Sequence, residues 1–147
     1  MGRAARDEFD QSLRSLVPIR ELIGDLMALC LEQSDHAAII VLEIKDAIVD
    51  GDCMLNQRLA RVYLMSDILF NSTAVPKGSK YRALFAEHQV EIFERLNQIH
   101  TAIQSRFVAE QFKTRVMTLL RAWTDWSVYA GDLLIKLNNT FLYVFEY

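Results

Sequence analysis

Three polar side chains, Tyr63, Asp67 and Asn71, are spaced four residues apart in an otherwise apolar segment. If the segment is helical, this spacing places all three along one face. A phenol supplies an aromatic wall and a hydroxyl, a carboxylate accepts hydrogen bonds, and an amide both donates and accepts them. The set suits the capture of an extended peptide, with the amide holding peptide backbone and the acid taking a tyrosine hydroxyl.

The helix that would carry this stripe is expected to be central and buried. Residues 54 to 72 are apolar at nearly every angle of a helical wheel. The apolar positions are Leu55, Leu59, Val62, Leu64, Met65, Ile68, Leu69 and Phe70. A buried carboxylate is costly unless it is paired, protonated or turned towards an opening that a ligand fills. Internal aspartates are usually satisfied by neighbouring groups, so a hydrogen bond from an adjacent helix cap is the alternative role for Asp67.

Basic residues cluster in two segments of a chain whose net charge is −3. Residues 56 to 82 carry five basic residues against Asp67 alone, and residues 105 to 121 carry four against Glu110. If the two segments meet in space they would form a local anion site, although ordinary solvated arginines are the alternative for most of them. The acidic total gives no reason to expect a general nucleic-acid binder.

The elements that position these residues are expected to be helices joined by short turns, because glycine and proline are few and strand patterns are nearly absent. The expected helices span residues 7–16, 18–33, 34–49, 54–72, 80–98, 101–109 and 110–129, with an eighth after Gly131. A turn is expected at residues 75–79, and Trp123 and Trp126 are expected in the core. Short connections between such helices favour an all-α bundle or a right-handed superhelix of stacked pairs.

The bulk composition bounds the class of protein. With 147 residues, 52% of them hydrophobic and 24% charged, the chain is expected to form one domain with a genuine core. The longest apolar run, residues 37 to 42, is far shorter than the roughly 20 residues of a membrane span, so a soluble domain is expected. Cys30 and Cys53 are expected to be reduced thiols of an intracellular protein, with no metal-ligand spacing. The sequence has no catalytic constellation and no phosphate loop, so neither enzymatic activity nor a cofactor is expected.

Two sequence blocks resemble a known family. Residues 63–72, with the sequence YLMSDILFNS, resemble the helix-four signature of the CTD-interacting domains, which read the C-terminal repeat tail of RNA polymerase II. Residues 112–129 are similar to helix seven of the same family, and residues 134–137 favour its branch of SURP-motif splicing factors associated with the branch-site snRNP. The resemblance covers residues 7–145 as a single domain, with residues 1–6 as an N-terminal extension.

The resemblance implies a right-handed superhelix of about eight helices, related to the ENTH and VHS folds. The family's ligand is an extended, phosphorylated Tyr-Ser-Pro-Thr-Ser-Pro-Ser repeat that lies in a groove between helices two, four and seven. A nuclear role is implied, in which a phosphoserine-containing polymerase tail is the partner and pre-mRNA splicing is coupled to transcription. Splicing factors are further implied partners, and no direct contact with nucleic acid or a membrane is expected.

The resemblance also assigns site residues. Tyr63 would line the groove, Asp67 would meet the repeat's tyrosine, and Asn71 would hold peptide backbone. Ser66 and Phe70 belong to the same peptide-contacting set. Relatives often carry Asn or Asp where this chain has Ser66, so one hydrogen bond would be weaker or displaced here.

The phosphate contact departs more strongly from the family, because the arginine that many relatives place five residues before the tryptophan is Thr118 in this chain. Arg115 lies three residues earlier on the same face and could supply a displaced contact. Arg20, expected in the first turn of the second helix, is another candidate because helix N-termini favour anions. Arg121 is a further candidate unless it pairs with Asp125 one turn on.

Two other classes of function stay open at this point. A degenerate scaffold that has lost tail binding would explain the Ser66 and Thr118 departures. A trafficking module of the ENTH or VHS type would bind phosphoinositides or sorting peptides, which needs a basic cluster or an amphipathic N-terminal helix. The acidic residues interspersed among Arg3, Arg6 and Arg14 argue against membrane attachment.

Overall fold

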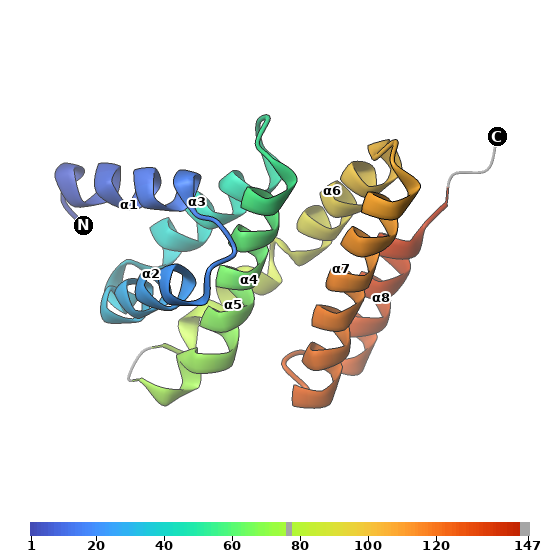
Figure 1. The fold of residues 1–147 in the computed structure, drawn as a ribbon. Helices are drawn as coiled ribbons and strands as arrows, with labels where there is room; N and C mark the ends of the chain where they lie inside the picture. Colours follow the sequence, from blue (N-terminus) through green and yellow to red (C-terminus); the bar gives the residue numbers. More distant parts are fainter. Residues whose placement is uncertain (76–77, 145–147) are drawn as a thin grey trace. The chain divides into compact units, whose positions relative to one another are not determined.

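The computed structural model describes residues 1–75 and 78–144, and the regular structure in these ranges is entirely helical (Figure 1). Its α-helices are α1 (Arg3–Ser15), α2 (Arg20–Glu32), α3 (Ala37–Val49), α4 (Leu55–Asn71), α5 (Lys80–Ala86), α6 (Gln89–Ala102), α7 (Arg106–Trp126) and α8 (Gly131–Leu142). The short 3-10 turns η1 (Ser34–His36) and η2 (Ser72–Ala74) follow α2 and α4. The expected all-α class with about eight helices is confirmed. The chain forms two compact units, Met1–Glu87 and His88–Tyr147.

Helix α4 is the central helix of the first unit, where it packs against α1, α2, α3 and α5. The expected burial is confirmed for six of its apolar residues: Leu59, Val62, Leu64, Met65, Ile68 and Leu69. The exceptions are Leu55, which is half-buried, and Phe70, of whose surface 54% is exposed. Helix α2 begins at Arg20, two residues after the expected start of this helix at Pro18, so the proline precedes the helix.

Two buried arginines hold the first half of α4 to its neighbours. Arg58 donates to two carbonyl oxygens, one in the last turn of α3 and one in the loop after it. Arg61 donates to the carbonyl oxygens of Ala47, at 2.6 Å, and Arg14, at 2.8 Å. Carbonyls near a helix C-terminus lack partners within the helix, so the guanidinium groups satisfy them. These two charges are therefore not available to the anion site expected from residues 56–82.

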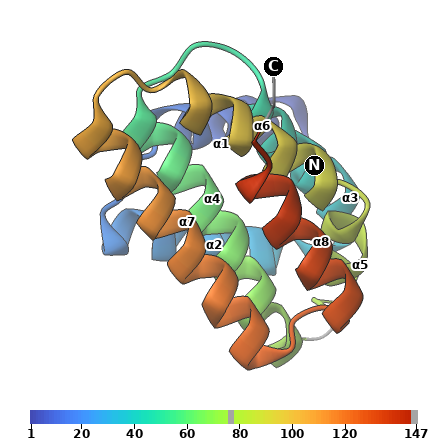
Figure 2. The same ribbon diagram turned by 90° about the vertical axis from the view of Figure 1, so that its right-hand side faces the viewer.

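In the second unit, α6, α7 and α8 pack against one another (Figure 2). Trp123 of α7 lies in the core of this unit. The ring of this fully buried residue meets Phe93 and Tyr129 edge-on, at centroid distances of 5.8 and 6.1 Å. Trp123 is a core residue, as expected. The same expectation for Trp126 was wrong, since 40% of its surface is exposed at the end of α7.

One helix expected at residues 80–98 is two helices in the structure. The break falls at Glu87 and His88, between α5 and α6. Neither residue is a glycine or a proline, so hydrophobic periodicity could not locate the break.

The expected separate helix at residues 101–109 is not formed. Ser105 caps α7, because its side chain accepts a 3.2 Å hydrogen bond from the backbone N–H of Val108. The helix therefore begins at Arg106 and continues to Trp126 as one element. All of the phosphate candidates between residues 115 and 121 thus lie on one helix.

The turns after α4 and α7 each depend on one residue. A Cβ at Gly78 would lie 2.0 Å from the carbonyl oxygen of Ser72, so only glycine fits there. Of the turn expected at this point, residues 76–77 lie outside the described residues. After α7 the chain turns at Ser127, whose φ is 52°, and Gly131 is instead the first residue of α8.

Candidate functional site

Only two side chains in the middle of α4 are accessible. Between residues 58 and 69 every residue is buried except Tyr63 and Asp67. The exposed Phe70 and the half-buried Asn71 continue this accessible face to the end of the helix. These four residues, Tyr63, Asp67, Phe70 and Asn71, are called the α4 strip below. The stripe read from the sequence is therefore the open face of an otherwise buried helix.

The carboxylate of Asp67 has no hydrogen-bond or ion-pair partner among the residues that the structure describes. Burial raises its pKa above the ordinary value for aspartate, and the positive charge of Arg20 partly offsets this rise. Within the described ranges no helix cap donates a hydrogen bond to the group, which was the alternative role for an internal aspartate. The carboxylate is thus partly desolvated and still has its acceptor capacity.

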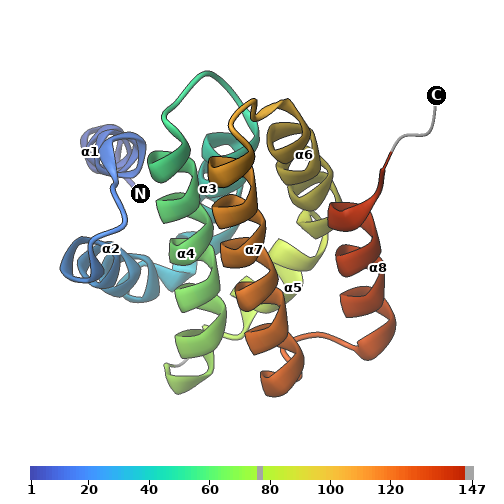
Figure 3. The same cartoon turned by 45° about the vertical axis from the view of Figure 1, so that its right-hand side comes forward.

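Helix α2 lies against α4, the helix that carries the strip (Figure 3). Its first residue, Arg20, is exposed and close enough to Asp67 to act on its pKa. Seven residues along the same face, the Sδ of Met27 lies 3.1 Å from the Nδ2 of Asn71. Gly24 lies between these two positions on that face, because residues four and three apart are neighbours on a helix.

Gly24 and Met27 are border residues that sequence reasoning missed. A Cβ added at Gly24 would meet no atom within 4 Å, so packing does not require glycine at this helix-interior position. The available signal was the spacing of Gly24 and Met27 from Arg20, at four and seven residues, which only becomes informative once α2 is known to lie against α4.

The side chains of Asn71 and Ser66 are less available than the sequence suggested. Asn71 donates through Nδ2 to the carbonyl oxygen of Asp67, at 2.9 Å, and to the sulfur of Met27. Its Oδ1 is left as the group that could accept a peptide N–H. Ser66 is 7% exposed and lies off the strip, although it precedes Asp67 in sequence.

The remaining phosphate candidates lie on α7 in the second unit. Arg115, Thr118 and Arg121 are all exposed. The hydroxyl of Thr118 donates to the carbonyl oxygen of Thr114 at 2.8 Å, so it is engaged within its own helix. Among the described residues Arg121 forms no ion pair with Asp125, which was the alternative use for this arginine. Among the described residues, the guanidinium groups of Arg115 and Arg121 are therefore free to meet an anion.

Other chemistry finds little support in the described part of the chain. Within it, no three His, Cys, Asp or Glu side chains are grouped so that they could hold a metal ion. Cys30 is buried, which raises the pKa of its thiol to about 12 and leaves it protonated and unreactive at neutral pH. None of the described helices is both long enough and apolar enough to cross a membrane.

A comparison with protein families identifies the domain that these helices form. The model of one family, the CID domain, matches residues 7–137. This chain belongs to the CTD-interacting domains. The match begins in α1 and ends in α8, so the family covers elements of both compact units. The CTD-interacting domain is a non-catalytic protein-interaction module of the kind that binds the polymerase tail, and the resemblance noted in the sequence is confirmed.

Two curated relatives come from Arabidopsis thaliana. The domain is 34% identical to Protein RRC1 and 31% identical to Protein RRC1-like, in each case over 138 residues. The aligned region is 93% of this chain but only 15% of each relative. The chain thus spans about 15% of the length of the curated relatives that it matches.

Proposed function

We propose that this domain binds the extended, phosphorylated heptad repeat of the RNA polymerase II tail, with the repeat's tyrosine at Asp67. The observation that carries the proposal is the half-buried carboxylate of Asp67, which accepts no hydrogen bond from the described residues and lies on the accessible face of a buried helix. A group in this state gains most from a ligand donor, because partial desolvation strengthens a charge-assisted hydrogen bond.

The other residues of the α4 strip suit the remainder of such a peptide. Phe70 and Tyr63 offer aromatic surface against which the proline rings of the repeat can pack. The Oδ1 of Asn71 would accept a peptide N–H, since its Nδ2 is already engaged. Asn71 can then only accept a hydrogen bond from the peptide backbone, which binds the peptide more weakly than an amide that both donates and accepts.

Phosphate recognition is assigned first to Arg20. Its guanidinium is exposed beside the strip, and it is the first residue of α2, whose N-cap Ile19 makes no side-chain cap. A helix N-terminus with free N–H groups adds favourable dipole and hydrogen-bonding interactions for a phosphate. Arg115 and Arg121 on α7 are the second set, and Thr118 contributes no charge where many relatives carry arginine.

The cellular role follows from this ligand. A reader of the phosphorylated tail would bring its parent protein to transcribing polymerase in the nucleus, and so couple pre-mRNA splicing to transcription. The affinity of the isolated domain is expected to be modest, with a Kd of about 10 to 100 μM, because an extended peptide loses much chain entropy on binding.

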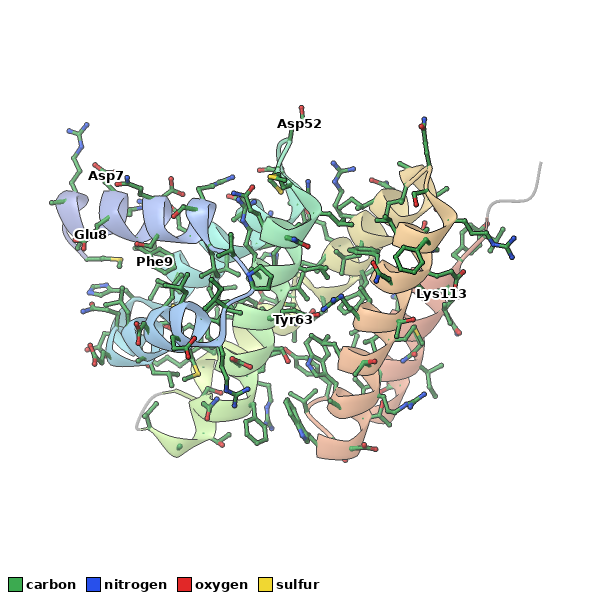
Figure 4. All side chains as sticks on the ribbon, viewed as in Figure 1. Asp7, Glu8, Phe9, Asp52, Tyr63 and Lys113 are labelled. Atoms are coloured by element: carbon green, nitrogen blue, oxygen red, sulfur yellow. The ribbon has the colours of Figure 1, made fainter. Side chains whose placement is uncertain are left out.

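The test is fluorescence anisotropy with labelled two-repeat tail peptides, either unmodified or phosphorylated. Asp67→Asn should weaken binding of every peptide by about tenfold, because one charge-assisted hydrogen bond is worth about 1.5–3 kcal/mol. Asp52→Asn is the matched control, since Asp52 is exposed in the loop before α4, away from Tyr63 in the middle of the helix (Figure 4). Equal binding by wild type and Asp67→Asn would contradict the assignment of Asp67.

The phosphate assignment needs separate variants. Arg20→Ala should reduce the preference for phosphorylated over unmodified peptide by roughly threefold to tenfold, and Arg115→Ala should have the smaller effect. An unchanged preference in both variants would exclude them as phosphate contacts. If no peptide binds at several hundred micromolar, the reader is excluded and the domain is a protein scaffold without tail binding.

A further inference from the structure

A recess lies entirely within the second unit, where α6 and the start of α7 meet the chain that leaves α8. Its volume is about 370 Å³. One side carries Arg106, Lys113 and one acidic residue, Glu110, all from α7, together with His100 from α6. The other side is apolar and is formed by residues 141–144. The opposition of a charged wall and an apolar wall is the feature from which a ligand can be inferred.

The apolar wall and the ring of His100 are fixed by contacts that the structure makes without a ligand. Asn97 is 5% exposed and donates to the carbonyl oxygens of Phe141, at 2.8 Å, and Tyr143, at 2.7 Å, so it holds the apolar wall in place. The ring of His100 lies parallel to that of Phe112, with 6.3 Å between centroids, and 5.8 Å from that of Phe141. The recess is therefore preorganised at its apolar wall and at His100.

The charge in the recess is uncommitted. Arg106 and Lys113 are seven residues apart and so share a face of α7, with Glu110 between them. None of these three side chains forms an ion pair among the described residues. The N-terminus of α7 adds the positive end of its helix dipole at Arg106. The local balance favours an anion, although the protein as a whole carries a net charge of −3.

A neighbouring recess restricts what kind of anion can bind. This hollow of about 690 Å³ lies beyond Asn97 and Tyr143 and is bordered by Glu94 and Asp132, against Lys136. A nucleic-acid strand carries a phosphate at every nucleotide, so a strand that crossed both recesses would bring phosphates against two carboxylates. A ligand with a single phosphate avoids this repulsion.

We propose that the basic recess binds one phosphoserine of a peptide whose adjoining apolar side chain packs on residues 141–144. The site does not depend on the α4 strip, and it stands whether or not the strip binds the polymerase tail. Exposed lysine and arginine contacts are individually weak and are screened by salt, so binding is expected to fall as ionic strength rises.

The experiment is an NMR titration of the 15N-labelled domain with a pentapeptide that carries one phosphoserine between leucines. The expected result is saturable shifts at His100, Arg106, Lys113 and residues 141–144. Lys113→Gln and Arg106→Gln should each weaken binding roughly threefold, and Glu110→Gln should strengthen it by about twofold. Lys136→Gln, which removes the same charge from the neighbouring recess, should leave the affinity unchanged.

Four outcomes would overturn the proposal. Equal shifts with the unphosphorylated pentapeptide would mean that the recess does not recognise the phosphate group. Equal affinity for inorganic phosphate would mean that the peptide makes no contribution to binding. An equal loss of affinity in Lys136→Gln and Lys113→Gln would mean that binding depends on the net charge of the protein and not on this recess. Tighter binding of a short single-stranded oligonucleotide, lost in Lys113→Gln, would make the ligand a nucleic acid. Asp67→Asn leaves this recess intact, so failure here and failure of the α4 strip are distinguishable.

Discussion

The two halves of α4 use charge in opposite ways. In the first half Arg58 and Arg61 are buried, and their guanidinium groups donate to backbone carbonyls. In the second half Asp67 is half-buried, and its carboxylate meets no donor among the described residues. A satisfied internal hydrogen bond stabilises the native state, whereas an unsatisfied, desolvated carboxylate destabilises it. The first half of the helix thus holds the fold, and the second half is left available to a ligand.

The largest expected effect is on stability and falls on the first half. Arg61→Ala should lower the free energy of unfolding by about 3 kcal/mol, because it leaves one buried and one partly buried carbonyl acceptor without their charged donor. Urea denaturation measures this loss. Arg3→Ala, at an exposed position on α1, should change stability by less than about 0.5 kcal/mol. A loss below about 1 kcal/mol in Arg61→Ala would remove the contrast between the halves.

The second half should respond in the reverse way. Asp67→Asn should weaken tail-peptide binding about tenfold while leaving the unfolding free energy unchanged or slightly higher, because a neutral amide avoids the cost of a desolvated charge. Anisotropy and urea denaturation on the same preparations check both statements. If Asp67→Asn were destabilised as strongly as Arg61→Ala, Asp67 would be a structural group.

The border on α2 sharpens the comparison further. Gly24→Ala should raise the unfolding free energy by about 0.5–1 kcal/mol, since alanine is the better helix former and its Cβ meets no atom within 4 Å. Gly24→Leu should also fold, but should weaken tail-peptide binding roughly fivefold if the peptide passes over this part of α2. Unchanged peptide affinity in Gly24→Leu would mean that the ligand does not approach α2 there.

The smallest expected effect is a pH dependence. The pKa of Asp67 is raised in the folded domain above the ordinary 3.8, so between that value and the raised pKa the native state binds more protons than the unfolded state. Wild-type stability should therefore fall relative to Asp67→Asn as the pH rises through this window, and the difference should level off above it. Urea denaturation of both proteins from pH 4 to 7 measures the difference. If the wild type instead became more stable relative to Asp67→Asn as the pH rises, the pH dependence would have the opposite sign. That result would contradict the claim that burial raises the pKa of Asp67.

The sequence could predict those features of the fold that local periodicity encodes. The spacing of Tyr63, Asp67 and Asn71 predicted a polar face on a buried helix, and the apolar pattern predicted that α4 is central. Both depend only on residues within a few turns of one another. The break at residues 87–88 was missed because no glycine or proline marks it.

What the sequence could not predict depends on contacts between distant segments. Arg58 and Arg61 counted as basic residues available to an anion, yet the carbonyls that Arg61 meets belong to residues 14 and 47 positions earlier in the chain. In the same way, Gly24 can be recognised as a residue that borders the α4 strip only when α2 is known to pack against α4. Charge counted along a sequence does not distinguish a structural guanidinium from one that is free to bind.

The most direct test of the central claim is a double-mutant cycle between Asp67 and the tyrosine of the repeat. Wild type and Asp67→Asn are each titrated with two-repeat peptides that contain either tyrosine or phenylalanine, so that only the hydroxyl differs. If Asp67 accepts from that hydroxyl, phenylalanine should weaken binding to wild type by about tenfold and to Asp67→Asn by much less. An equal loss for both proteins would mean that the hydroxyl and the carboxylate do not meet, and would contradict the account.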